Sequence, residues 1–260
     1  MAPNSIDDKY DGCTSYMYNE INTVYLPHEK KTNSDFMESW KVAEAKWNLN
    51  NGLGLKKEQF MAIYAYTNEA PAIYQDFNKK VRKDKDKYGK SFQYHSLHFY
   101  LTEAIHTLNE PLCLDTYRRT TLYYDRNVVN KKFRFGTFTS SSLRTNLLNF
   151  GNVSCFKIRT CYGANVARYS AIKRESEILI PPYEVFNVTN VQTKPPKGPL
   201  DDCEVVYTVV STRTPKSDLN CKLVRNGGTT NLRSSFVSFI RASDTGYIMF
   251  YIMLITTVYY

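Results

Sequence analysis

The sequence predicts an α+β fold, with helices in its first half and strands in its second. Before Leu114 the apolar residues recur at helical spacing, and after it short runs of β-branched and aromatic residues alternate with Pro/Gly loops. Helices followed by strands favour an α+β domain over a doubly wound sheet. The chain has no internal repeat and no G-x-G-x-x-G or G-x-x-x-x-G-K-[ST] loop, so any nucleotide would bind outside a Rossmann or P-loop site.

Four helices are expected in the first half. They cover residues 35–47, 58–66, 72–81 and 96–108. In the first of them Phe36, Trp40 and Trp47 share one face, and Asp35 with Glu38 resembles an N-terminal capping pair.

Six strands are expected in the second half. They cover residues 117–124, 133–138, 153–160, 178–191, 204–210 and 236–240. The Pro/Gly-rich stretch 194–199 separates the fourth from the fifth.

Composition gives only broad limits on function. The 260 residues are 42% hydrophobic with a net charge of +9, which is typical of a globular protein and favours anionic partners without choosing among nucleic acid, membrane or a phosphorylated small molecule. The charged run 79–90 indicates a solvated helix end and loop.

The six cysteines are spread through the chain and form no C-x-x-C pair, which argues against a zinc or thioredoxin-like site. Their even number favours disulfides in an oxidising compartment, with buried free thiols as the alternative. Sequons at Asn152 and Asn187 agree weakly with a secreted glycoprotein.

The two ends give conflicting indications. The first eight residues contain no apolar h-region, so no signal peptide is visible, as in a fragment or a chain that starts at its mature end. The nearly uncharged stretch 246–260 is shorter than the ~20 residues of a membrane span. With Ser234 and Ser235 upstream it is typical of a removable lipid-anchor signal, and a terminal core strand is the alternative.

Three short segments carry chemically useful residues. Glu175 and Glu177 precede an apolar strand, and on an extended chain residues two apart project to one side. Arg118 lies in an expected strand, where an arginine is costly unless it is paired or bound to a ligand. Ser140 and Ser142 belong to a serine cluster, which alone is typical of a turn or cap.

Taken together and in this order, the segments resemble the vertebrate-type ecto-ADP-ribosyltransferase family. That family has Tyr-Arg-Gly in a strand, then Phe-x-Ser-x-Ser, then Glu-x-Glu followed by Leu-Ile-Pro. This chain has Tyr-Arg at 117–118, Phe-Thr-Ser-Ser-Ser at 138–142 and Glu-Ser-Glu-Ile-Leu-Ile-Pro at 175–181. The resemblance extends from Asp7 to Cys221 and implies a helical part followed by a two-sheet β core, the ADP-ribosyltransferase fold, stapled by disulfides.

The resemblance also implies a domain layout and a cysteine pairing. A single catalytic domain is expected over residues 7–225, helical to 112 and β from 113, followed by the tail 226–260. The implied pairs are Cys13–Cys221 and Cys113–Cys161, with Cys155 and Cys203 left as a possible third pair.

Roles for the catalytic residues follow from the resemblance and from chemistry. NAD⁺ is the implied co-substrate, without a metal. Arginine's planar fork suits its pyrophosphate, so Arg118 is the expected clamp. Glu177 is expected beside the cation that develops on the ribose, Ser140 holds it in register, and Glu175 pairs with an acceptor guanidinium.

Further residues are implied at the nucleotide. Tyr117, Arg119, Asn149 and Phe150 complete the expected NAD⁺ contacts, with Phe150 stacking on nicotinamide, and the stretch 168–174 resembles a loop that faces the protein target. Arg119 departs from the family's glycine, and its bulk would either obstruct the nucleotide or supply a second phosphate contact. The pair His95 and His98 lacks a third ligand, which favours a structural role.

The predicted function is transfer of ADP-ribose from NAD⁺ to arginine side chains of proteins outside the cell, by a secreted or lipid-anchored enzyme. The alternatives are an NAD⁺ glycohydrolase, a non-catalytic surface protein that keeps the fold, and a nucleic-acid-binding module, which would leave the cysteines unexplained. The resemblance predicts no nucleic-acid partner, and membrane contact only through the lipid anchor.

Overall fold

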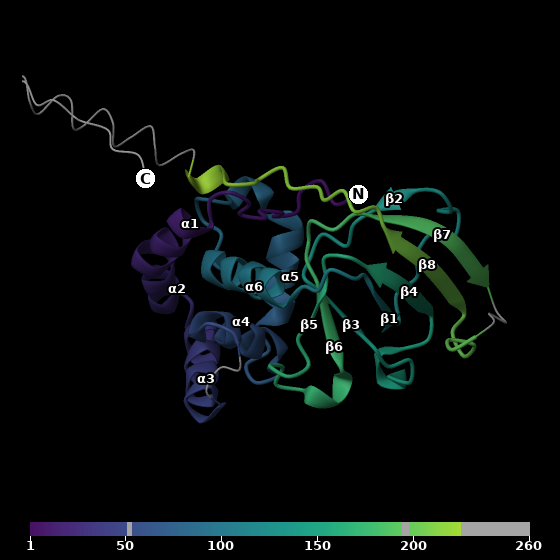
Figure 1. The fold of residues 1–260 in the computed structure, drawn as a ribbon, viewed down its shortest axis with the longest axis horizontal. Coiled ribbons are helices and arrows are strands. Elements are labelled where there is room, and N and C mark those ends of the chain that lie inside the picture. Colours follow the sequence, from purple (N-terminus) through teal and green to yellow (C-terminus); the bar gives the residue numbers. More distant parts are fainter. Residues whose placement is uncertain (51–53, 194–197, 225–260) are drawn as a thin grey trace, which may run out of the picture. The chain divides into compact units, whose positions relative to one another are not determined.

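The computed structural model describes residues 1–50, 54–193 and 198–224, and residues 1–222 form one compact unit. Within this unit the helices gather on one side and the strands on the other (Figure 1). The predicted α+β class is confirmed. The predicted strand 236–240, the serines at 234–235 and the tail 226–260 lie outside the described residues.

The helical part contains all four predicted helices. The helices are α1 (Thr14–Glu20), α2 (Leu26–Thr32), α3 (Ser34–Asn50), α4 (Lys57–Thr67), α5 (Tyr74–Lys83) and α6 (His95–Leu108), with a π-helical turn at Ile21–Tyr25 and a 3₁₀ turn at Lys85–Lys87. Helix α6 is buried on nearly all sides from its first residue to Ile105, including polar residues such as His98 and Thr102. The charged run 79–90 forms the end of α5 and the loop after it, as predicted.

Two features of the helical part differ from the sequence prediction. The start of α3 is capped by Asn33, whose side-chain oxygen accepts a 3.1 Å hydrogen bond from the backbone N–H of Phe36, and the predicted pair of Asp35 with Glu38 does not cap it. Helices α1 and α2 were not predicted, because α1 exposes Tyr16 and α2 is mostly polar, so neither has a clear apolar face.

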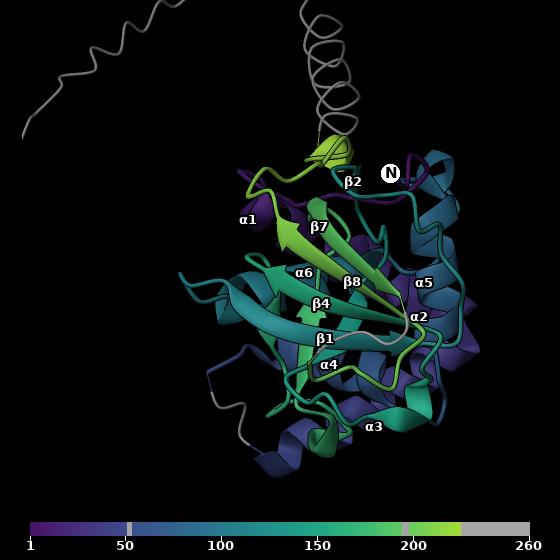
Figure 2. The ribbon, with the colours of Figure 1, turned by 90° about the vertical axis from the view of Figure 1, so that its right-hand side faces the viewer.

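The strands form a single mixed sheet (Figure 2). They are β1 (Leu114–Thr120), β2 (Lys132–Phe133), β3 (Thr139–Ser142), β4 (Ser154–Thr160), β5 (Ala164–Asn165), β6 (Glu177–Ile180), β7 (Phe186–Thr193) and β8 (Val205–Ser211), in the order β2-β7-β8-β4-β1-β3-β6-β5. The predicted strand 178–191 is two strands, because Pro181 and Pro182 interrupt it with a turn. Only the first residue of the predicted strand 133–138 lies in a strand.

The expected two sheets are present as two halves of this one sheet. A single residue pair, Tyr117 with Ser142, joins β1 to β3, whereas β1 pairs with β4 along its whole length from Leu114 to Thr120. The half β2-β7-β8-β4-β1 and the half β3-β6-β5 are therefore held together by very few backbone hydrogen bonds. The side chains described below lie at this joint.

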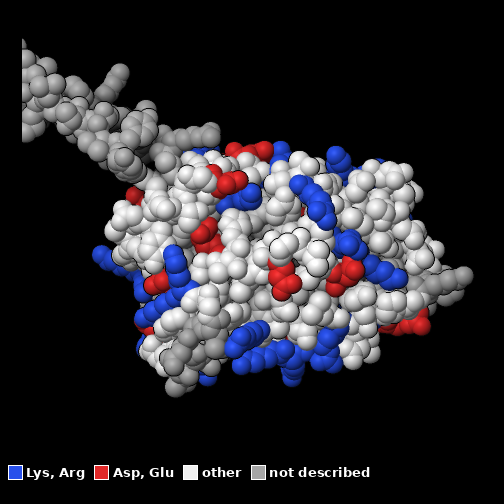
Figure 3. Space-filling view, in the orientation of Figure 1, with Lys and Arg blue, Asp and Glu red and all other residues white. Residues whose placement is uncertain are grey.

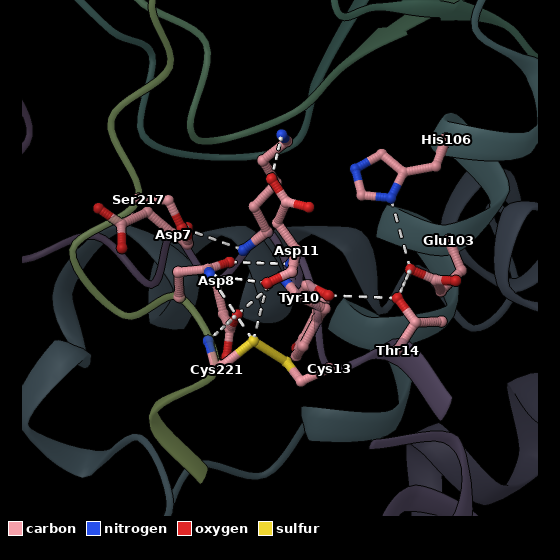
Figure 4. Close-up of a disulfide and its surroundings, with 12 residues drawn as sticks. Asp7, Asp8, Tyr10, Asp11, Cys13, Thr14, Glu103, His106, Ser217 and Cys221 are labelled. Atoms are coloured by element: carbon pink, nitrogen blue, oxygen red, sulfur yellow. Dashed lines mark hydrogen bonds and ion pairs between the residues drawn. A yellow bond between two sulfur atoms is a disulfide. The ribbon is translucent and has the colours of Figure 1, made fainter. Parts of the chain in front are cut away.

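All six cysteines are paired. Cys13–Cys221 and Cys113–Cys161 form as predicted, and Cys155–Cys203 is the third bridge. Figure 4 shows that Cys13 and Cys221 bring together two segments 208 residues apart.

Polar contacts support the first of these bridges. Asp8 accepts hydrogen bonds from the backbone N–H groups of Tyr10 and Cys221, and Asp7 accepts one from Leu219. The N-terminal segment of the unit and its C-terminal segment are therefore joined by hydrogen bonds as well as by the disulfide.

The positive charge is distributed over the surface. Figure 3 shows Lys and Arg side chains in several groups on one face, including a row along its lower edge, with Asp and Glu between them. On this face the net charge does not form the single basic patch that is typical of nucleic-acid binding.

Candidate active site

A cavity of about 610 Å³ opens between the sheet joint and the helices α4 and α5. Arg118 of β1, Ser140 of β3 and Glu177 of β6 all line it, as does Glu175 just before β6. A smaller pocket of about 50 Å³ adjoins it and shares these four residues. The structure therefore brings together the four predicted catalytic residues, three from strands of both half-sheets and Glu175 from the turn before β6.

Arg118 reaches across the joint. Its guanidinium donates a 2.6 Å hydrogen bond to the backbone carbonyl oxygen of Ser140. Thr116, two residues earlier on the same face of β1, donates a 2.8 Å hydrogen bond to the carbonyl oxygen of Ser142. Arg118 keeps further donors for a ligand, because a guanidinium carries five N–H groups.

Glu177 is the buried carboxyl group of the cavity, with 3% of its surface exposed. Burial raises its pKa to about 7, and the charge of Glu175 acts in the same direction. Hydrogen bonds from the Ser140 and Ser170 hydroxyls, together with the charge of Arg118, favour the ionised form. Near neutral pH this carboxyl group is thus poised between its two protonation states.

Glu175 and Glu177 meet in the cavity by a different geometry from the one predicted. Glu175 ends a 3₁₀ turn (Lys173–Glu175), and Ser176 then adopts a left-handed backbone with φ of 48° before β6 begins. The segment is therefore not an extended strand, and its alternation does not explain why the two carboxylates lie together. Glu175 is half-buried, and burial followed by the charge of Glu69 raises its pKa.

Several contacts fix the backbone that leads into this turn. The Ser142 hydroxyl donates a 2.5 Å hydrogen bond to the carbonyl oxygen of Glu175, and Arg144 donates a 2.9 Å hydrogen bond to that of Arg174. The Thr67 hydroxyl accepts a 2.8 Å hydrogen bond from the backbone N–H of Ala171. The loop 168–174 is therefore held from α4 on one side and from β3 on the other.

The remaining predicted nucleotide contacts have different surroundings. Phe150, 43% exposed, lines both pockets, and Tyr117 lines the smaller one. Asn149 is exposed and is not among the described residues that line either pocket.

Arg119 borders both pockets, but its guanidinium is already engaged. It makes two hydrogen bonds of 2.7 and 2.8 Å to the carboxylate of Asp202, and its Nε donates one of 2.7 Å to the carbonyl oxygen of Thr145. A phosphate contact from Arg119 would require breaking this ion pair. The sequence suggested that Arg119 either obstructs the nucleotide or binds a phosphate. Neither alternative included its ion pair with Asp202.

The helical wall of the cavity was not predicted. Tyr66 of α4 lines it, donating a 3.0 Å hydrogen bond to the carbonyl oxygen of Phe138 and accepting one of 3.0 Å from Asn78. From α5, one polar face contributes the residues Gln75, Asn78, Lys79 and Arg82. The i, i+3, i+4, i+7 spacing of these residues could have revealed this polar face from the sequence. The face lies opposite the apolar face that was used to predict the helix.

His95 and His98 have structural partners. His95 lies 3.2 Å from the carboxylate of Glu29, and His98 lies 2.9 Å from the hydroxyl of Tyr10. Burial lowers the pKa of His98 to about 3, so it is neutral at physiological pH. Within the described residues no group of three or more His, Cys, Asp or Glu is arranged to hold a metal ion, and no helix is long and apolar enough to cross a membrane.

Comparison with known proteins gives consistent matches. The chain is 36% identical over 204 residues to NAD(P)(+)–arginine ADP-ribosyltransferase 2 of Gallus gallus, covering 74% of this chain and 65% of that protein. It is 32% identical over 242 residues to T-cell ecto-ADP-ribosyltransferase 2 of Mus musculus, covering 89% and 79%. The chain thus spans just under two thirds of the chicken relative.

Solved structures agree with the sequence matches. The crystal structure of the eukaryotic mono-ADP-ribosyltransferase ART2.2 superposes with a TM-score of 0.69 and 31% identity, covering 85% of this chain and 96% of that one. A mutant of that enzyme in complex with NAD gives the same TM-score at 30% identity. Exoenzyme S from Pseudomonas aeruginosa, at 14% identity and a TM-score of 0.54, shares the fold.

A family model described as NAD:arginine ADP-ribosyltransferase matches residues 1–199. This range includes β1, β3 and β6 at the joint and all four residues that meet in the cavity. The chain belongs to the NAD:arginine ADP-ribosyltransferase family.

Proposed function

We propose that this protein transfers ADP-ribose from NAD⁺ to arginine side chains of other proteins and releases nicotinamide. The observation that carries the proposal is Glu177, a buried carboxyl group with a pKa raised to about 7, facing the same cavity as Arg118 and Ser140. The names of the relatives support the donor and the acceptor.

The larger pocket would hold the ADP-ribose part of NAD⁺, and the smaller one would hold nicotinamide. Arg118 supplies a planar cationic fork for the pyrophosphate, which is the geometry that phosphate oxygens match best. The polar face of α5, with Lys79 and Arg82, provides further positive charge along the cavity. Phe150 offers an aromatic surface where the two pockets meet.

Glu177 would act on the bond that breaks. As the C1′–N bond to nicotinamide lengthens, its electron pair leaves with nicotinamide and positive charge develops on the ribose. A fixed carboxylate beside that carbon stabilises the charge where it appears. Binding of the positively charged nicotinamide ring favours the ionised form of Glu177, and the Ser140 and Ser170 hydroxyls keep the carboxylate oriented.

Glu175 would serve the acceptor. A guanidinium has a pKa above about 12, so it stays protonated until its nitrogen attacks C1′. Glu175 is only half-buried and lies at the edge of both pockets, where a protein side chain can approach it. It can pair with the guanidinium, orient one nitrogen and accept the proton that is released.

NAD⁺ glycohydrolase activity is the second candidate, because the groups that cleave NAD⁺ do not depend on the acceptor. The experiment is to incubate the protein with NAD⁺ and agmatine and to measure ADP-ribosyl-agmatine, free ADP-ribose and nicotinamide together. Formation of the agmatine adduct supports transfer. Nicotinamide release with free ADP-ribose alone contradicts transfer and leaves hydrolysis, and no release contradicts both.

An extracellular setting is part of the proposal. Relatives named ecto-ADP-ribosyltransferases and three disulfides in a unit of 222 residues both support an oxidising environment. Protein acceptors that carry arginine are the proposed partners.

A further inference from the structure

Arg119 stands where the family pattern has glycine, so none of its contacts could be made by the expected residue. Successive side chains of a strand point to opposite faces, and the guanidinium of Arg119 reaches Asp202 and Cys203 rather than the carbonyl oxygen of Ser140 that Arg118 contacts. Its side chain is 4% exposed, and this buried charge is balanced by Asp202, whose side chain is 39% exposed.

The guanidinium of Arg119 connects two segments that are far apart in the sequence. On one side both of its terminal nitrogens donate hydrogen bonds to the carboxylate of Asp202, at 2.7 and 2.8 Å. On the other its Nε donates to the carbonyl oxygen of Thr145 at 2.7 Å, and a terminal nitrogen lies 3.5 Å from the carbonyl oxygen of Gly151. Arg119 therefore contacts both ends of the segment 145–151.

The segment 145–151 forms one wall of the smaller pocket through Leu147 and Phe150. Its far end is tightly placed, because Gly151 has a φ of 109° and a Cβ there would come within 2.9 Å of the backbone of Thr120 and Thr121. At its near end, Nε of Arg119 donates the 2.7 Å hydrogen bond to the carbonyl oxygen of Thr145.

The Asp202 side of the connection is fixed by a covalent bond. Asp202 precedes Cys203, and the disulfide joins Cys203 to Cys155, which lies directly opposite Arg119 in the register of β1 with β4. The carboxylate that holds Arg119 is therefore tied to the same strand pair that presents it.

We propose that Arg119 is a positioning residue that holds the wall 145–151 of the nicotinamide pocket in place, through its ion pair with Asp202. The inference rests on the proposed function, because nicotinamide is assigned to the smaller pocket. Arg119 acts through Leu147 and Phe150 and does not touch the pyrophosphate.

The test separates the two ends of the nucleotide by using nicotinamide and ADP-ribose as independent probes, each titrated by NMR. Arg119→Met should weaken nicotinamide binding about tenfold, the effect of losing one charge-assisted hydrogen bond, and leave ADP-ribose affinity within about twofold. Asp202→Asn, a milder change at a partly exposed site, should weaken nicotinamide binding in the same direction. Arg119→Lys should fall between wild type and Arg119→Met, because it keeps the charge near Asp202 and loses the fork.

Hydrogen exchange supplies a readout that does not depend on catalysis. The backbone amides of Phe150 and Gly151 donate hydrogen bonds to the carbonyl oxygens of Leu147 and Leu148. Both amides should exchange faster in Arg119→Met and in Asp202→Asn than in wild type. Lys85→Met is the matched control, because it removes a 2.7 Å ion pair with Asp218 that lies outside both pockets and should change neither probe.

The possible results point in different directions. Unchanged nicotinamide affinity in Arg119→Met, with wild type binding both probes, overturns the positioning role alone. Loss of ADP-ribose affinity together with nicotinamide affinity also overturns it, because Arg119 would then act at the phosphates. If wild-type protein binds neither probe, the proposed function fails first.

Discussion

The guanidinium of Arg118 and the backbone carbonyl oxygen of Ser140 are 2.6 Å apart and form a hydrogen bond across the joint of the sheet. Only one residue pair links β1 to β3, so this side-chain contact and that of Thr116 with Ser142 supply much of the connection. The residues that we assign to the phosphate and to the ribose thus belong to opposite halves of the sheet, and their separation depends on a few side chains.

Replacing Arg118 with lysine tests whether NAD⁺ binding needs the planar guanidinium or only its positive charge. Lysine keeps the positive charge and loses both the hydrogen bond to Ser140 and the bidentate geometry, so the KM for NAD⁺ should rise about 10–100-fold. Steady-state kinetics of nicotinamide release measures this. Arg126→Lys, at an exposed site after β1, is the control and should behave like wild type. An unchanged KM in Arg118→Lys would remove Arg118 from the phosphate site.

Replacing Glu177 with glutamine should abolish both transfer and hydrolysis, because both need the carboxylate beside the developing cation. Nicotinamide release with and without agmatine is the measurement, and circular dichroism checks the fold. Retention of a tenth of wild-type turnover would rule out the proposed role.

The same variant should change the pH dependence of stability. Burial raises the pKa of Glu177 to about 7 from 4.5, so the folded state holds a proton that the unfolded state releases between these values. This contribution is fully present below pH 4.5 and is lost as the pH rises to 7, by roughly 3 kcal/mol. Urea unfolding should therefore show Glu177→Gln more stable than wild type at pH 8.5 and about equal to it at pH 4. Equal stability at both pH values would mean that burial does not penalise the charge.

Replacing Glu175 with glutamine separates the acceptor from the donor. Transfer to agmatine should fall roughly 10–100-fold, the equivalent of one charge-assisted contact, while hydrolysis persists because water needs no such pairing. Both products should be measured on one preparation. Glu38→Gln, which removes a carboxylate from an exposed site on α3 outside both pockets, is the control and should leave the ratio of transfer to hydrolysis unchanged. A parallel fall of both activities in Glu175→Gln would place Glu175 at the NAD⁺ site.

The disulfide bonds can be tested in protein from a secretory host. Non-reducing peptide mapping should recover the three pairs of the structure and no free thiol. Replacing Cys113 and Cys161 together with serine opens a loop of 48 residues and should lower the free energy of unfolding by about 4 kcal/mol in the loop-entropy model. Free thiols at these positions would contradict the extracellular setting.

Much of this architecture could be predicted from the sequence because local patterns encode it. Helix α6 keeps its apolar residues at helical spacing, and β4 and β8 have dense β-branched and aromatic runs. The single sheet could not be predicted, since it depends on one long-range pair between Tyr117 and Ser142 that no local pattern specifies.

The candidate site could be predicted only in part, because local motifs identify its residues but do not specify their long-range contacts. Glu175 and Glu177 were found by a motif, but the left-handed Ser176 between them is a backbone choice that the motif does not reveal. The partner of Arg119 is Asp202, 83 residues away in the sequence, and this ion pair accounts for a buried arginine in the strand.

The three disulfides turn the described unit into a set of closed covalent rings. The bridge between residues 13 and 221 encloses a macrocycle that contains every strand, and the other two bridges interleave within it, in the order 113, 155, 161 and 203. One cut by a protease anywhere between residues 13 and 221 therefore opens a ring and releases no fragment. A protein cut between Arg118 and Glu175 keeps these two residues on one covalent molecule until the disulfides are reduced.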